Sequence, residues 1–167
     1  MKKSRIYIDT SVIGGCFDEE FAIWSNGLVV DFKAGLFKPI LSDIVAAEVN
    51  DAPDRVREKF KEILEESLRL DPDMPHTQFE LGRLLKASGD PKGIELIKKA
   101  FDKWKDRFDK NKMTESDYSW LPSAADELGM HDFAHQVRQS KPQFKGEGMY
   151  NPDNLTKSYV EEGLIKR

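Results

Sequence analysis

The chain has 167 residues, with 26 basic and 30 acidic side chains, which gives a formal net charge of −4 and a pI near 5.5. This balance argues against a globally basic nucleic-acid coat protein, but it leaves room for a local basic patch. Hydrophobic residues make up 39% and charged residues 34%, which is typical of a folded, helix-rich chain and excludes wholesale disorder.

Redox and targeting signals favour the cytoplasm. The single cysteine, Cys16, excludes an internal disulfide and the cysteine-rich zinc sites, as expected in a reducing compartment. The opening MKKSRIYIDT has an apolar run too short for a signal peptide, and no stretch approaches the ~20 apolar residues of a membrane span. We therefore expect a cytoplasmic protein with no membrane segment.

The first fifty residues predict a βαβ unit followed by a helix. A strand over residues 5–9 leads into a turn eased by two glycines, and a helix follows over roughly 18–34. A second strand over 37–41 carries Pro39 at its start or on an exposed edge, and a further helix begins after Ser42. The two strands are expected to be parallel, so that their C-terminal ends share one rim of the sheet.

The rest of the chain is predicted to be helical. A helix after Pro53 covers the sheet, the segment 71–75 breaks the chain, and no later segment has the pattern of a strand. Two helical hairpins follow, one turning at Ser88–Pro91 and one at Gly129. The fold class is thus α/β, with a half-domain over 1–70, helical hairpins over 75–140 and a loop-rich tail over 141–167.

The stretch FELGRLLKASGDPKGIELIKKAF resembles a tetratricopeptide repeat, with Leu81-Gly82 and Gly89 near that pattern's Leu-Gly and turn positions. The stretch ELGMHDFAHQVRQ resembles the turn of a second repeat. Its separation from the first is longer than the usual period, and its small-residue positions are offset.

Two acids attract attention because they sit in apolar surroundings. Asp9 ends an otherwise apolar strand, and the pattern around Glu48 draws its carboxylate toward the apolar face of its helix. A carboxylate in such a place is costly unless it is paired, hydrogen-bonded or bound to a metal. The two are one βαβ unit apart, so both can converge above the rim. Helix capping or pairing with arginine is the alternative interpretation.

The segments YIDTSVIGG, FDEEFAIWSNGL and KPILSDIVAAEVNDAPDRVRE, taken in order, resemble a PIN-domain subfamily that includes VapC-type toxins. The resemblance covers roughly residues 4–67. It implies that Asp9 and Glu48 bind Mg²⁺ or Mn²⁺, that Ser11 supports them from the second shell, and that the protein hydrolyses RNA. It also implies an antitoxin protein as partner, with homodimerisation left open. Hard carboxylate oxygens suit these ions.

PIN domains supply a third and often a fourth acid from a later helix and strand. Asp117 in SDYSWLPSAADELGMHDF is the best third candidate, and Asp132 is a candidate for the fourth. The alternative is that Asp117 caps a helix and Asp132 sits in a turn.

Other patterns are interpreted as structural. His131 and His135 have the spacing of zinc ligands but no evident third ligand, so surface histidines are expected. Cys16 is expected to pack near the turn. The three tryptophans are expected in the core. The basic run over 98–112 suits a solvated helix face or, alternatively, an RNA backbone.

Two functions of different class follow. The first is a PIN-like, metal-dependent ribonuclease of toxin type. The second is a non-catalytic interaction module in which the N-terminal half is a scaffold and the helical hairpins bind a peptide or a partner helix. The discriminating feature is whether a carboxylate beyond Asp9 and Glu48 reaches the rim.

Overall fold

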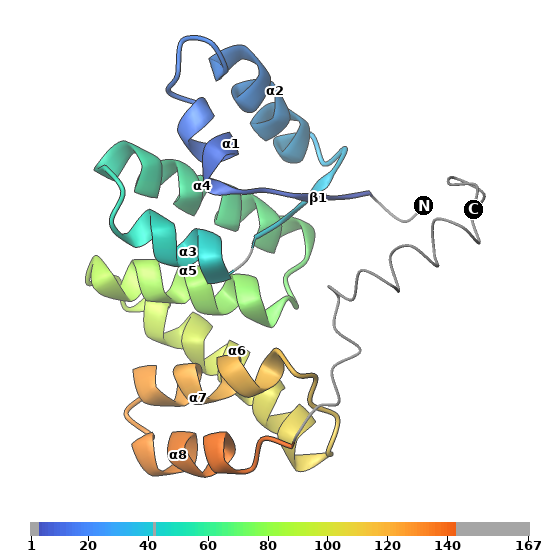
Figure 1. Ribbon diagram of the computed structural model, residues 1–167, viewed down its shortest axis with the longest axis vertical. Helices are drawn as coiled ribbons and strands as arrows, with labels where there is room; N and C mark the ends of the chain where they lie inside the picture. Colours follow the sequence, from blue (N-terminus) through green and yellow to red (C-terminus); the bar gives the residue numbers. More distant parts are fainter. Residues whose placement is uncertain (1–3, 42, 143–167) are drawn as a thin grey trace, which may run out of the picture.

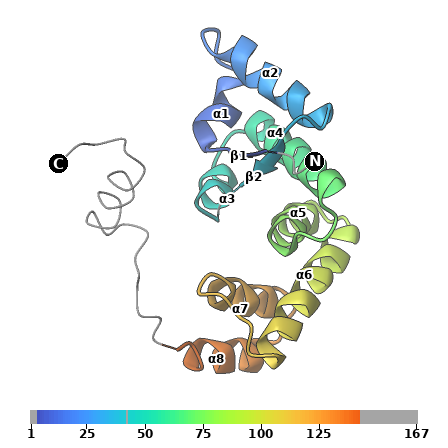
Figure 2. The same cartoon turned by 90° about the vertical axis from the view of Figure 1, so that its right-hand side faces the viewer.

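The computed structural model describes residues 4–41 and 43–142. Helices dominate this part of the chain, which follows an arc from α2 at one end to α8 at the other (Figures 1 and 2). The elements in order are β1 (Arg5–Tyr7), α1 (Thr10–Gly15), α2 (Ala22–Lys33), β2 (Lys38–Ile40), α3 (Asp43–Asn50), α4 (Asp54–Leu70), α5 (Pro75–Ala87), α6 (Lys92–Asp109), α7 (Asp117–Glu127) and α8 (His131–Gln139).

The two strands are parallel, as predicted. Ile6 lies opposite Pro39, and the ladder continues on both sides through hydrogen bonds from Lys38 N to Ser4 O and from Ile8 N to Ile40 O, both 2.9 Å. Pro39 lacks an N–H group, and it is tolerated here because β2 pairs on one side only within the described residues. The α/β character is therefore confined to this short pair of strands.

The predicted turn after the first strand is wrong, because Thr10–Gly15 forms the helix α1. Asp9 caps this helix by accepting a hydrogen bond from Val12 N. A Cβ on Gly15 would lie 2.5 Å from Ser25 Oγ, so this glycine serves the close approach of α1 to α2 rather than a turn.

Two hydrophobic clusters form the core. The first gathers side chains from β1 to α4 and includes Leu81 and Leu85 of α5, while the second joins α5 to the last three helices. Helix α5 thus contributes to both clusters, although the chain break predicted at 71–75 precedes it. Cys16 packs in the first cluster as expected, and burial raises the pKa of its thiol.

Both predicted helical hairpins are present, and no strand follows Pro75 within the described residues. Gly89 and Gly129 adopt φ values of +79° and +76°, a backbone conformation that other residues adopt at a cost, and each ends the first helix of its hairpin. The predicted tail lies almost wholly in 143–167, outside the described residues. No helix among the described residues has the length and apolarity needed to cross a membrane.

The tryptophans divide between core and surface. Trp104 is fully buried, and it stacks on the partly buried Trp120 with ring centroids 6.1 Å apart. Trp24 on α2 is exposed, so its predicted place in the core is wrong. Helix α2 buries Ser25, Val29 and Phe32 instead, on the opposite side.

An ion pair joins β2 to the end of α4, and it predicts a pH-dependent stability. The ammonium group of Lys38 donates a hydrogen bond to the Asp71 carboxylate, which holds the pKa of Asp71 below its usual range. A carboxyl group whose pKa is lowered by folding stabilises the folded state above its unfolded pKa of about 4, and this contribution is lost as the pH falls through the folded pKa.

We expect Asp71→Asn to lower the free energy of unfolding by roughly 1–2 kcal/mol at neutral pH, because it leaves the largely buried Lys38 unpaired. Urea denaturation at neutral pH and at about pH 3 should show the difference between variant and wild type shrinking in acid. Asp132→Asn, which removes an exposed acid from α8, is the control. A difference that did not depend on pH would contradict the assigned role of the ion pair.

Candidate functional site

Asp9 and Glu48 are brought to the same end of the parallel strands. Asp9 precedes α1 and Glu48 lies on α3, and the Thr10 hydroxyl donates a hydrogen bond of 2.6 Å to Oε2 of Glu48. The Ser11 hydroxyl donates a hydrogen bond of 2.6 Å to Oδ1 of Asp9, which also accepts the Val12 N–H at 3.1 Å. One short segment, 9–12, therefore holds both carboxylates.

The surroundings of the two carboxylates differ from those expected from the sequence. Its side chain is exposed, so its predicted location on an apolar face is wrong; Val45 and Val49 of α3 are buried instead. The hydrogen bonds from Ser11 and then from Val12 lower the pKa of Asp9, so its carboxylate stays ionised. Both groups are accessible to a ligand from solvent.

The other predicted acids are engaged elsewhere. Asp117 begins α7, where its buried carboxylate pairs with Arg107 at 3.0 Å and accepts the Thr114 N–H at 2.9 Å. Asp132 is exposed in the first turn of α8. Helices α7 and α8 lie at the end of the molecule remote from α1 (Figures 1 and 2). The structure therefore places Asp9 and Glu48 at the same end of the strands, whereas Asp117 and Asp132 lie far from it. A third carboxylate at the rim is the feature that separates the two functions, and neither Asp117 nor Asp132 supplies it.

Within residues 4–41 and 44–142, no three Asp, Glu, His or Cys side chains are grouped closely enough to hold a metal. His131 pairs with Asp126 at 2.9 Å, and His135 contacts Gln139 at 2.9 Å. Both histidines are exposed, as expected for surface residues. A cation at the rim would therefore be held by two carboxylates and by water.

The basic run along α6 is largely paired with acids, as a solvated helix face would be. Ion pairs join Lys103 to Asp73, Lys105 to Asp109, Arg107 to Asp117 and Lys110 to Asp106. This pairing favours the interpretation of the run as a solvated helix face.

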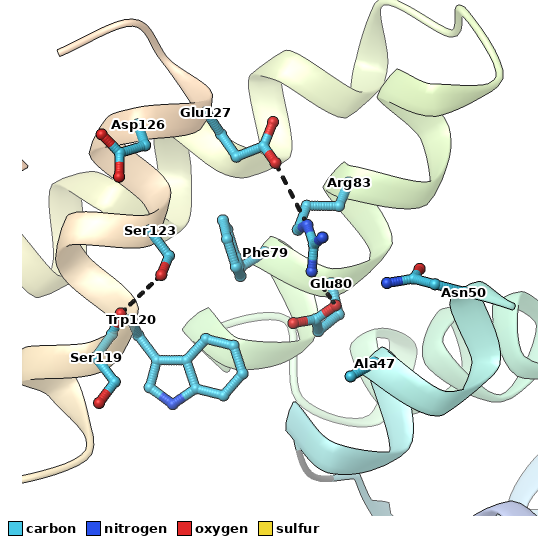
Figure 3. Close-up of a pocket in the computed structure, with 10 residues that line it drawn as sticks. All are labelled: Ala47, Asn50, Phe79, Glu80, Arg83, Ser119, Trp120, Ser123, Asp126 and Glu127. Atoms are coloured by element: carbon cyan, nitrogen blue, oxygen red, sulfur yellow. Dashed lines mark hydrogen bonds and ion pairs between the residues drawn. The ribbon is translucent and has the colours of Figure 1, made fainter. Parts of the chain in front are cut away.

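A second candidate surface is a groove of about 590 Å³ between α3, α5 and α7. Figure 3 shows Ala47 and Asn50 on one wall, Trp120 and Glu127 on the other, and Phe79 and Arg83 between them. The groove thus lies between the N-terminal half and the second hairpin.

Ion pairs balance the charges of the groove. Arg83 lies 3.5 Å from Glu80 and 3.4 Å from Glu127 (Figure 3). The Glu127 carboxylate also accepts a 2.6 Å hydrogen bond from Lys86. At the same end, Arg138 and then His131 lower the pKa of Asp126 by hydrogen bonding. A ligand here would meet aromatic surface bordered by paired charges.

Sequence reasoning missed the roles of Thr10 and Arg83. Thr10 fell in the turn predicted after the first strand, although its place directly after Asp9 was a signal. Arg83 carried no signal, because its partner Glu127 is 44 residues away and the pairing depends on how the hairpins stack.

Comparisons of the chain with protein-family models, with curated proteins and with solved structures gave no match. The resemblances to PIN domains and to tetratricopeptide repeats therefore stay predictions from the sequence.

Proposed function

We propose that Asp9 and Glu48 bind a divalent cation, Mg²⁺ or Mn²⁺, and that this site hydrolyses phosphodiester bonds of RNA in the manner of a PIN-domain ribonuclease. The observation that carries the proposal is the hydrogen bond from Thr10 to Glu48, which keeps the Glu48 carboxylate beside the residue that follows Asp9. The parallel arrangement of β1 and β2 supports it as well, because ligands of α/β folds bind beyond the C-terminal ends of the strands.

The donor set fits a hard cation in its chemistry, but it is small. The hydrogen bonds described above fall on Oδ1 of Asp9 and on Oε2 of Glu48, so the other oxygen of each carboxylate faces no donor among them. Carboxylate oxygens are the ligands that Mg²⁺ and Mn²⁺ prefer. With two acids, the affinity should be lower than in a site with four.

Four residues have distinct roles in the proposed cation site. Asp9 and Glu48 supply the negative charge that holds the cation, while Ser11 and Thr10 fix the orientation of one carboxylate each. A bound divalent cation would supply positive charge next to a phosphate group and acidify water near it.

Titration calorimetry with Mn²⁺ tests the cation site. We expect measurable binding by the wild-type chain and loss of binding in Glu48→Gln, which keeps the shape of the side chain and removes its charge. Thr10→Val should weaken binding by about 10-fold or more, because it removes a group that orients Glu48. Asp132→Asn is the matched control and should bind as the wild type does.

A second candidate function is favoured by the groove between α3, α5 and α7. Its volume of about 590 Å³ and its aromatic lining suit a peptide or a partner helix, whose binding would make the chain an interaction module. Calorimetry separates the two candidates. If the wild-type chain bound neither Mg²⁺ nor Mn²⁺, the ribonuclease proposal would be overturned, and the interaction module would be the remaining one of these two functions.

A further inference from the structure

Helix α2 has two apolar faces and buries only one of them. Its inner face, with Ser25, Val29 and Phe32, packs into the first core cluster. The opposite face is exposed, and we call it the outer face of α2. Its residues Ile23, Gly27, Val30 and Ala34 follow one another at intervals of four, three and four positions, so they lie on one side of the helix. Trp24 lies at the edge of this face and is counted with it. Helix α2 forms one end of the molecule, so no described element covers this face (Figures 1 and 2).

The exposed apolar area on the outer face is large for a small protein. Ile23 is 78% exposed, Trp24 77% and Val30 61%. An aromatic side chain alone presents about 150–250 Å², so with the neighbouring Phe21 the apolar surface reaches roughly 500 Å². A patch of this size matches the largest apolar patch on a typical monomer, and such patches are often interaction sites.

Gly27, at the centre of the outer face, has no packing role among the residues that the structure describes. A Cβ at Gly27 would meet no atom within 4 Å, whereas at Gly93 it would lie 2.4 Å from Lys86 N of α5. Glycine inside a helix costs about 1 kcal/mol relative to alanine. At Gly93 this cost allows two helices to pack closely. At Gly27 the equivalent helix is missing from the described chain.

We propose that the outer face of α2 binds the same face of a second copy, with the two α2 helices crossing antiparallel at Gly27 about a twofold axis. The axis would place Ile23 of one copy opposite Val30 of the other, apolar against apolar. Asp31 lies beside the face and does not interrupt it.

The area agrees with this occupant. Two outer faces together bury about 1,000 Å², which is the lower end of specific interfaces and corresponds to a weak dimer. The proposal is independent of the cation site, because it uses no residue of the segment 9–12 or of α3.

Sedimentation equilibrium of the full chain over a range of micromolar concentrations tests the proposal. We expect the apparent mass to rise from 19.1 kDa toward twice that value as the concentration increases. Gly27→Ala should weaken association by at least 10-fold, because its methyl group separates the helices. The same substitution should leave the monomer as stable as the wild type or more so, since it removes a helix-interior glycine. A thermal melt therefore distinguishes lost association from lost folding.

Two further variants complete the experiment. Ile23→Ser should also abolish association, whereas Ile94→Ser, which removes an exposed isoleucine from α6, should not change it. A wild-type chain that stays monomeric at the highest concentration would overturn the proposal. The outer face of α2 would then not be a site of self-association. Equal association by Gly27→Ala, or equal loss in Ile94→Ser, would overturn it as well.

Discussion

Asp9→Asn is expected to abolish Mn²⁺-dependent cleavage of RNA while the fold is retained. Asparagine keeps the shape of the side chain and is an equally good helix cap, so the hydrogen bond from Val12 N that starts α1 should persist. The substitution removes one of the two negative charges that hold the cation in our proposal. Glu48 alone then offers one carboxylate of the pair, so the affinity for a divalent cation should drop sharply.

The stability of Asp9→Asn in the presence of a chelator separates a functional from a structural effect. We expect its free energy of unfolding to fall by no more than about 1 kcal/mol, because asparagine keeps the helix cap and loses only the extra strength that a charged acceptor gives to the hydrogen bonds from Ser11 and Val12. Cleavage of a labelled single-stranded RNA, with and without Mn²⁺, is the activity measurement. Cleavage by Asp9→Asn at the wild-type rate would show that the activity does not depend on this site.

Gly93→Ala is expected to be the most destabilising of the substitutions considered. The new Cβ would lie 2.4 Å from Lys86 N, 2.6 Å from Gly82 O and 2.9 Å from Lys86 Cα. All three atoms belong to the backbone of α5, so no change of side-chain conformation can relieve the contact. Helices α5 and α6 would have to separate, and α5 carries residues of both core clusters.

We expect Gly93→Ala to lower the free energy of unfolding by roughly 3 kcal/mol, at the upper end for overpacking, because the clash is with backbone atoms. This loss outweighs the gain of about 1 kcal/mol that alanine brings in helix propensity. A decrease in melting temperature of roughly 6–12 °C should follow. Gly27→Ala is the matched control, since the same substitution in open space should not destabilise the monomer. A Gly93→Ala protein as stable as the wild type would mean that the two helices do not pack this closely.

Much of the secondary structure could be predicted because its signals are local. Alternating apolar residues near Ile6 indicate a strand, and glycines such as Gly89 and Gly129 stop helices through their own backbone freedom. The parallel pairing also followed from the sequence, since a helix between two strands brings them side by side in the same direction. The helix α1 was not predicted. Its N-cap residue, Asp9, was assigned to the end of the preceding strand, and an aspartate is compatible with both positions.

The candidate site could be predicted only in part. That Asp9 and Glu48 lie at the same end of the strands follows from one βαβ unit, whereas the hydrogen bond from Thr10 to Glu48 depends on how α3 packs beside α1. Asp117 shows the limit of such reasoning. Its sequence surroundings suit a helix start better than a metal ligand but allow both, and the structure shows its carboxylate paired with Arg107, ten residues before it on another helix.

The sequence by itself determined which residues form helices and strands and where the hairpins turn, because these depend on neighbours along the chain. Tertiary structure decided which apolar faces are covered. Trp24 and Trp104 both follow a helical apolar pattern, yet one is exposed and the other fully buried. Periodicity says that a face is apolar, but burial requires a second element to lie against it. Trp104 meets α5 and α7 in the second core cluster, whereas α2 lies at the end of the arc with its outer face uncovered.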